Sequence, residues 1–267
     1  MTLEEKLHHA EDLKTRIDAF QRPPLSFGNA RASLAMARRW DAANPAEAAE
    51  RFRLCEELDT LQRDIDREST ERDAIERNLR RLAGKLQRSG ASPRALDAAE
   101  AAKPTEALTL VQRWLPDESL TWLVMCGDKG VGKTVAATWA VRELCARGRS
   151  GAVKRATEVA KLSQFDAGKA ELDWLKRVDL LVVDDFGTEL LNDYARAVWH
   201  ELLDYRHEFY GRTIITSNLH WLTKGDKPGL ADRLGERLVD RVQQAGRVQQ
   251  LQAERSLRRI GKKPEAA

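Results

Sequence analysis

The 267-residue sequence predicts an α/β fold, with a parallel sheet covered by helices on both faces and an all-α region ahead of it. Three apolar runs, at residues 120–127, 178–187 and 212–219, alternate too little with polar residues for a sheet that faces water. Stretches with helical spacing separate these runs, and a glycine-rich turn joins the first run to a helix. Residues 151–156, "GAVKRA", fit a further strand. Strands separated by helices are typical of parallel pairing.

The composition excludes several classes of protein. The 45 Lys and Arg residues nearly balance the 42 Asp and Glu residues, so any nucleic-acid-binding face must be local. No apolar run approaches the roughly 20 residues that cross a bilayer, and we expect a cytoplasmic protein with no membrane partner. The scattered cysteines Cys55, Cys126 and Cys145 lack a CxxC pair, so they predict reduced thiols instead of a disulfide framework or a zinc site.

The N-terminal residues predict three helices. Thr2 followed by Glu5 is the signature of a capping box, and a second, short helix is expected over 31–43. Asn44 and Pro45 fit the cap and first residue of a long third helix. Its apolar residues keep a heptad register: Leu54, Leu58, Leu61, Ile65, Ile75, Leu79, Leu82 and Leu86.

This heptad pattern is typical of a coiled-coil hairpin or a dimer seam, and so few heptads do not distinguish pairing within the chain from pairing between chains. We interpret residues 1–90 as a helical partner-binding region and 91–104 as a linker. Residues 105–250 form the expected α/β domain, and 251–267 a basic C-terminal tail.

The glycine-rich turn fits the pattern GxxxxGK[ST] between a strand and a helix. Its residues are Gly127, Asp128, Lys129, Gly130, Val131, Gly132, Lys133 and Thr134. Glycines let successive backbone N–H groups face one point, to which the helix N-terminus adds a positive field, so the turn suits the phosphates of ATP. We expect Lys133 to reach the β- and γ-phosphates and the Thr134 hydroxyl to ligate Mg²⁺.

Acidic residues follow the second apolar run. Mg²⁺ held through one hydroxyl needs a carboxylate from a neighbouring strand, and Asp184 at the strand end supplies it. Asp185 sits where a carboxylate polarises the attacking water, and Glu189 is a weaker acidic candidate.

Two further features complete the expected site. Asn218 ends the third apolar run with a side chain able to hold the nucleophilic water or the γ-phosphate. Arg233, Arg237 and Arg241 recur every four residues, which predicts one face of one helix. Surface arginines are usually solvated ion-pair partners, but one of these could act as an arginine finger across a subunit boundary.

The segments "GDKGVGKT", "DLLVVDDFGTE", "LLDYRHEFYGRTIITSNL" and "RLGERLVDRV" together resemble the AAA+ ATPases of the DnaC/IstB type, relatives of the DnaA initiator. The resemblance covers about 105–250 and implies a P-loop NTPase αβα sandwich that hydrolyses ATP with Mg²⁺ as a homo-oligomer. It implies that Asp184 and Asp185 are the Walker B pair and Asn218 is sensor 1. Arg241 falls at the arginine finger, with Arg237 as second choice.

The resemblance also bears on the C-terminus and on DNA. Only 26 residues follow Arg241, which predicts no separate C-terminal lid domain. Relatives of the initiator type line a central channel with DNA near residues 157–175. Basic residues around this region predict contacts with single-stranded or duplex DNA, although any one of them could belong to a solvated helix face: Lys154, Arg155, Lys161 and Lys169, with Lys176 and Arg177 nearby.

Three functions fit the sequence. The first is an ATP-dependent helicase loader in DNA replication, which oligomerises on DNA and recruits a replicative helicase through its N-terminal helices. The second is an IstB-like regulator of transposition that presents DNA to a transposase. The third is a nucleotide-bound scaffold with little turnover, whose active surface is the coiled coil.

Overall fold

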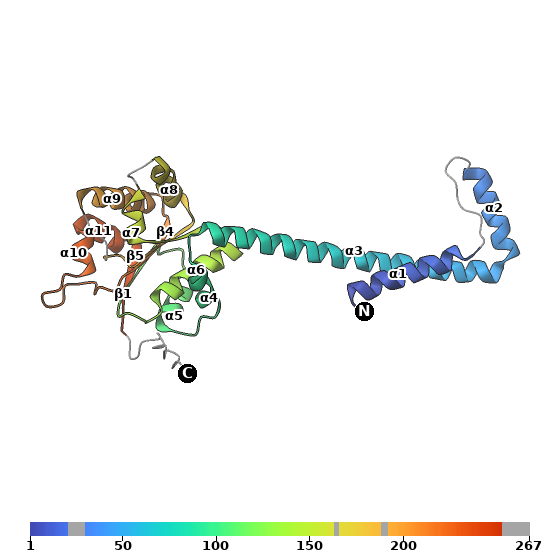
Figure 1. Cartoon of the computed structure of the whole chain (residues 1–267), viewed down its shortest axis with the longest axis horizontal. Helices are drawn as coiled ribbons and strands as arrows, with labels where there is room; N and C mark the ends of the chain where they lie inside the picture. The colour runs from blue at the N-terminus through green and yellow to red at the C-terminus, as the bar shows by residue number, and fades with distance from the viewer. Residues whose placement is uncertain (21–29, 163–165, 188–191, 253–267) are drawn as a thin grey trace, which may run out of the picture. The chain divides into compact units, whose positions relative to one another are not determined.

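The protein is described by a computed structural model (Figure 1). The structure describes residues 1–20, 30–162, 166–187 and 192–252. The chain divides into two compact units, Met1–Arg80 and Arg81–Ala267.

The first unit is helical, as predicted. Its elements are α1 (Leu3–Asp18), α2 (Ala30–Ala43) and most of α3 (Pro45–Arg88). The predicted capping box is confirmed: the backbone N–H of Glu5 donates to the Thr2 hydroxyl, and the Glu5 carboxylate accepts from the backbone N–H of Thr2.

Helix α1 packs on α3 within the chain. The Lys6 ammonium lies 2.7 Å from the Glu68 carboxylate, and Leu13 and Leu54 are buried. Some of the apolar heptad residues are therefore buried by pairing of helices within one chain. Ile75 and Leu79, later in the same pattern, are 61% and 60% exposed.

The second unit contains a five-stranded parallel sheet. Its strands are β1 (Trp122–Gly127), β2 (Gly151–Arg155), β3 (Leu180–Asp184), β4 (Arg212–Thr216) and β5 (Gly246–Leu251). Their order is β2-β3-β4-β1-β5, and every pairing is parallel. Strand β5 was not predicted, because "GRVQQL" is too polar for a buried strand and pairs at the sheet edge beside β1.

Helices cover both faces of this sheet, which confirms the predicted αβα layers. Because successive side chains of a strand point to opposite faces, Trp122 and Val124 pack in one core while Leu123 and Met125 pack in the other. The first core includes α8 (Asp166–Arg177), α9 (Asp193–Glu208), α10 (Leu230–Leu234) and α11 (Glu236–Ala245); the second includes α5 (Glu106–Trp114) and α6 (Lys133–Ala146). The short helix α7 (Ala156–Val159) follows β2, and within the described residues no helical lid follows β5.

The segment interpreted as a linker is structured. It contains α4 (Pro93–Glu100), which the Ser92 hydroxyl caps by accepting from the N–H of Ala95, and which packs on α6 with Ala99 buried. The alanines that suggested a linker allow this close helix packing. The last turns of α3 also belong to this unit, since the N–H of Val153 in β2 donates to the Ser89 carbonyl at 2.7 Å.

The prediction of a single helix carrying three arginines was wrong. Gly235 has a φ of 78°, a left-handed value that favours glycine, and it separates α10 from α11. Arg233 therefore lies on α10, whereas Arg237 and Arg241 lie one turn apart on α11.

The buried guanidinium of Arg206 links the end of α8 to β4 through hydrogen bonds. Arg206 on α9 is fully buried; it donates to the Thr213 hydroxyl at 2.9 Å and to the carbonyls of Leu175 and Val178 at 2.8 and 2.9 Å. Burial lowers the pKa of Arg206 to about 10, so the group stays charged at neutral pH. The carbonyl at the end of α8 thus receives a partner that the helix itself cannot supply.

Arg206→Met should lower the free energy of unfolding by about 3 kcal/mol or more, because several buried acceptors lose their donor at once. Arg196→Met, at an exposed position of the same helix, should change it by about 0.5 kcal/mol at most. Urea unfolding followed by circular dichroism measures both. Equal losses in the two variants would contradict the role given to Arg206.

Candidate functional site

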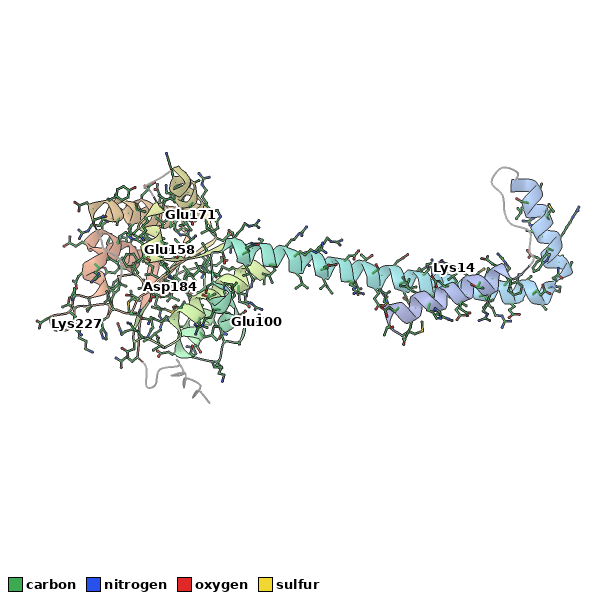
Figure 2. The ribbon with its side chains drawn as sticks, viewed as in Figure 1. Lys14, Glu100, Glu158, Glu171, Asp184 and Lys227 are labelled. Carbon is green, nitrogen blue, oxygen red and sulfur yellow. The ribbon has the colours of Figure 1, made fainter. Side chains whose placement is uncertain are left out.

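The candidate site lies at the carboxyl ends of β1, β3 and β4. In a parallel sheet these ends share one edge, and β4 lies between β1 and β3. The residues that follow the three strands therefore meet: the glycine-rich turn after β1, Asp184 and Asp185 at β3, and Asn218 after β4. Figure 2 places Asp184 inside this unit. Ligands of open α/β sheets bind at such an edge.

The glycine-rich turn takes backbone conformations that require glycine. Gly127, Gly130 and Gly132 have φ values of 125°, 86° and 90°. A Cβ on Gly127 would also lie only 1.9 Å from the carbonyl oxygen of Leu251 in β5, so this position accepts no side chain. Helix α6 begins at Lys133, directly after Gly132. The turn thus presents the helix N-terminus to the site, as anion binding demands.

Lys133 is buried and bonded on several sides. Its ammonium donates to the carbonyls of Gly127 and Asp128 at 2.9 and 2.8 Å, and to Oδ1 of Asn218 at 3.2 Å. Burial lowers the pKa of Lys133, and nearby carboxylates, Asp185 foremost, counter that effect. A phosphate that enters the site meets a cation already desolvated and aimed.

Asp184 accepts two hydroxyl hydrogen bonds on one oxygen. The Thr134 hydroxyl donates to Oδ1 at 2.8 Å and the Thr216 hydroxyl at 2.5 Å. Burial raises the pKa of Asp184, and the bonds from Thr216 and Thr134 counteract the rise. Thr216 was not predicted as a site residue. Its position at the end of the neighbouring strand, two residues before Asn218, could have indicated that it belongs to the site.

These groups fit a magnesium site in which the nucleotide supplies further ligands. A carboxylate and a hydroxyl are hard oxygen donors, and they lie within 2.8 Å of each other. Among the described residues no cluster of three or more His, Cys, Asp or Glu side chains forms a metal cage. In proteins, Mg²⁺ is commonly coordinated by one or two carboxylates together with phosphate oxygens and water, and Asp184 and Thr134 fit this coordination.

Asn218 bridges the lysine and the second aspartate. Its Oδ1 accepts from Lys133, while its Nδ2 donates to Oδ1 of Asp185 at 2.8 Å. Asp185 has a φ of 56°, in the left-handed region that Asp tolerates better than most residues. Its N–H donates to the Thr216 hydroxyl at 3.1 Å, which fixes the turn. This backbone conformation therefore places the Asp185 carboxylate within hydrogen-bonding distance of Asn218.

A cavity of about 680 Å³ opens between these residues and the start of the unit. One wall is formed by Gly130 and residues 132–136 with Asp185 and Asn218, and the other by residues 101–103, Thr105 and Leu108. The second wall was not predicted, since no motif marks it. Thr105 stabilises it by capping α5 through the N–H of Leu108 at 3.1 Å.

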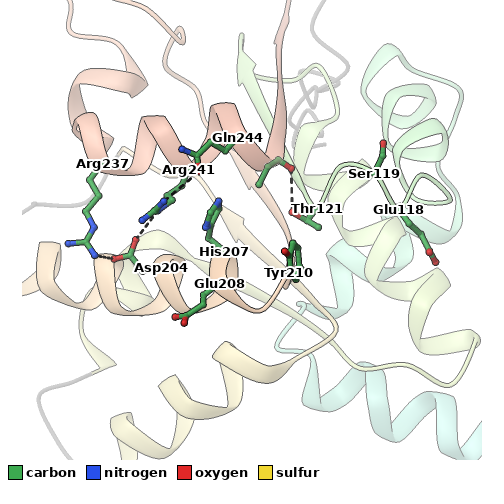
Figure 3. Close-up of a pocket in the computed structure, with 11 residues that line it drawn as sticks. Glu118, Ser119, Thr121, Asp204, His207, Glu208, Tyr210, Arg237, Arg241 and Gln244 are labelled. Atoms are coloured by element: carbon green, nitrogen blue, oxygen red, sulfur yellow. Dashed lines mark hydrogen bonds and ion pairs between the residues drawn. The ribbon is translucent and has the colours of Figure 1, made fainter.

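The two arginines of α11 lie elsewhere, beside a second hollow of about 610 Å³ (Figure 3). Both pair with Asp204 of α9: Arg237 at 2.5 Å and the Nε of Arg241 at 3.7 Å. The nucleotide-side cavity and this hollow share no lining residue. Arg233 is exposed on α10, near the turn at Gly187.

The predicted DNA contacts fall around β2, α7 and α8. Lys154 pairs with Glu171 of α8, whereas Arg155, Lys161 and Lys169 are exposed. Glu189 and the basic tail from residue 253 onward lie outside the described residues.

Comparison with known families gives one match that covers most of the chain. The model of the family described as IstB-like ATP binding protein matches residues 36–263. A protein of Sinorhizobium fredii named as an insertion sequence ATP-binding protein is 37% identical over 126 residues, 44% of this chain and 50% of its own length. The replicative helicase loader DnaC of Escherichia coli is 28% identical over 134 residues, 47% of this chain and 51% of its own length.

The chain thus spans about half the length of the curated relatives it matches. Solved structures share its fold: a DnaC helicase loader with a TM-score of 0.50 and 24% identity, covering 60% of this chain and 99% of the other. The replication initiator DnaA bound to AMPPCP and single-stranded DNA has a TM-score of 0.50 and 21% identity, over 62% and 52%. The predicted AAA+ fold is confirmed. None of the helices described is both long and apolar enough to span a membrane.

Thr216→Val should weaken Mg²⁺ affinity about fivefold to thirtyfold, because Asp184 loses a buried hydrogen bond that favours its charged form. Thr216→Ser keeps the hydroxyl and should stay close to the parent. Magnesium titration of nucleotide binding, with a fluorescent ATP analogue, measures the difference. Parent-like affinity in Thr216→Val would contradict this role.

Proposed function

The chain belongs to the IstB-like ATP-binding protein family, and on this premise we propose that it binds ATP with Mg²⁺, hydrolyses it and oligomerises on DNA. The observation that carries the proposal is the bonded chain from Lys133 through Asn218 to Asp185 beside the cavity. It joins a phosphate-binding cation to a carboxylate suited to water activation. Fold alone would not assign a function.

Each group of site residues has a separate role in the proposed hydrolysis. The turn at Gly127–Thr134 holds the phosphates through backbone N–H groups, and Lys133 exchanges its carbonyl partners for β- and γ-phosphate oxygens. Asn218 orients the attacking water, and the Asp185 carboxylate accepts its proton. Thr134 and Asp184 would hold Mg²⁺, which would neutralise charge on the phosphates.

Catalysis also requires positive charge on the γ-phosphate. We assign this to Arg241 of a second copy, with Arg237 as the second choice, since both lie on the hollow that is separate from the chain's own nucleotide-side cavity. A site completed between copies makes turnover depend on oligomerisation.

The proposed biological role is that of a DnaC-like helicase loader in DNA replication. The N-terminal helices would recruit the replicative helicase, and Arg155, Lys161 and Lys169 would contact DNA phosphates, with Lys154 once its pairing with Glu171 is exchanged. The likeness to the DnaC loader supports this reading.

A second candidate role is regulation of transposition. The family match and the 37% identity to an insertion sequence ATP-binding protein favour it. The third, a nucleotide-bound scaffold, predicts no turnover under any condition. Binding assays with a replicative helicase and with a transposase, each with and without ATP, separate the first two roles: a nucleotide-dependent complex with one alone identifies the partner class.

Lys133→Ala should weaken ATP binding about thirtyfold or more, since the phosphates lose a desolvated cation. Asp185→Asn should bind ATP like the parent and lose turnover by about a hundredfold or more, because the amide accepts no proton. Isothermal titration and phosphate release measure the two effects. Turnover at the parent rate in Asp185→Asn would refute the assignment of the base.

Arg241→Ala should lower turnover about a hundredfold or more while leaving nucleotide affinity unchanged. Mixing it with Lys133→Ala subunits should restore activity, because each pair then contains one intact cavity facing one intact arginine. No recovery in the mixture would indicate that Arg241 acts only within its own fold.

A further inference from the structure

The cavity beside the glycine-rich turn is short of positive charge. Its described lining contains two cations, Lys103 and Lys133, and no arginine. Charge that develops on a γ-phosphate needs donors aimed at it before the reaction begins. An arginine from another surface would supply the missing positive charge.

The hollow that carries Arg241 lies at the opposite edge of the sheet. Three of its lining residues lie just before strands begin. Thr121 directly precedes β1, Tyr210 lies two residues before β4, and Ala245 directly precedes β5. The nucleotide-side cavity lies at the carboxyl ends of the strands. Arg241 thus cannot serve its own cavity, and its natural acceptor is the phosphate edge of a second copy.

Asp204 engages two arginines with different oxygens. Its Oδ2 lies 2.5 Å from a terminal nitrogen of Arg237, and its Oδ1 lies 3.7 Å from Nε of Arg241 (Figure 3). Arg237 is 63% exposed, whereas Arg241 is 32% exposed. Nη1 of Arg241 donates to Oε1 of Gln244 at 3.5 Å. The contact with Asp204 is thus made by the inner edge of the Arg241 guanidinium.

We propose that Asp204 is a positioning residue that aims Arg241 at the nucleotide phosphates of a second copy of this chain. The proposal rests on the proposed function. Arg237 offsets the charge of Asp204, so Arg241 keeps its positive charge within this group of three, while Glu118 and Glu208 also line the hollow. Because Asp204 faces Nε and Gln244 faces Nη1, the other terminal nitrogen of Arg241, Nη2, remains for a contact with phosphate oxygens.

Loss of the Asp204 charge removes this arrangement in two ways. Arg237 and Arg241, one turn apart on α11, would repel each other without the carboxylate between them. The Arg241 side chain would also regain its rotamer freedom and would have to be ordered again at each encounter. Small misplacements of a catalytic group are costly in rate.

The test uses Asp204→Asn in the full-length protein. Turnover per protomer should fall about tenfold to a hundredfold, with nucleotide affinity and melting temperature close to the parent's. Glu208→Gln is the control, because Glu208 lies on the same helix and lines the same hollow; it should turn over like the parent. Asp204→Glu restores the charge and should recover much of the lost rate.

Two combinations separate positioning from a general structural role. Mixing Asp204→Asn with Lys133→Ala should restore turnover, since the intact cavity of the first then faces the intact arginine of the second. In an Arg241→Ala background, Asp204→Asn should cause no further loss. Lack of rescue, or a further tenfold loss, would overturn the proposal.

These variants distinguish failure of the Asp204 positioning role from failure of the arginine that acts across copies. If Arg241→Ala lowers turnover but Asp204→Asn does not, the positioning role is wrong and the arginine acting across copies stands. If Arg241→Ala turns over like the parent, both the proposed arginine and its positioning residue are wrong.

Discussion

The contact between the Thr134 hydroxyl and Asp184, 2.8 Å long, is the constraint on which the site depends. It joins the first turn of α6 to the end of β3 across the intervening strand β4. The intervening strand β4 contributes Thr216, whose hydroxyl bonds to the same Asp184 oxygen. Three separated segments of sequence thereby hold one oxygen-rich point beside the glycine-rich turn, and the phosphate and metal chemistry follows from that placement.

The ionic groups of the site are hydrogen-bonded to one another through Asn218. Asn218 presents its oxygen to the buried Lys133 and its amide nitrogen to the half-buried Asp185, so both groups have partners of suitable polarity. An arriving triphosphate competes for Lys133 and so disturbs the bond network that reaches Asp185. In the proposed mechanism, Asn218 would therefore couple nucleotide binding at Lys133 to water activation at Asp185.

Much of this arrangement could be predicted from local patterns. Four of the five strands, the turn at Gly127–Thr134 and the helices that begin at Leu3 and Pro45 follow from periodicity, caps and glycine. The strand β5 could not, because a polar edge strand lacks an apolar signature. The break at Gly235 and the pairing of α11 with Asp204 arise from tertiary packing, which spacing along the chain does not encode.

The central claim is that the hydrolytic site is completed between copies, because the nucleotide-side cavity and the arginine-bearing hollow occupy opposite edges of one sheet. Steady-state ATP turnover per protomer, measured across protein concentration without DNA, with single-stranded DNA and with duplex DNA, tests it most directly. The account predicts turnover per protomer that rises with concentration and saturates at lower concentration when DNA gathers the copies together. The same turnover per protomer at every concentration, from dilute monomer upward, would contradict it.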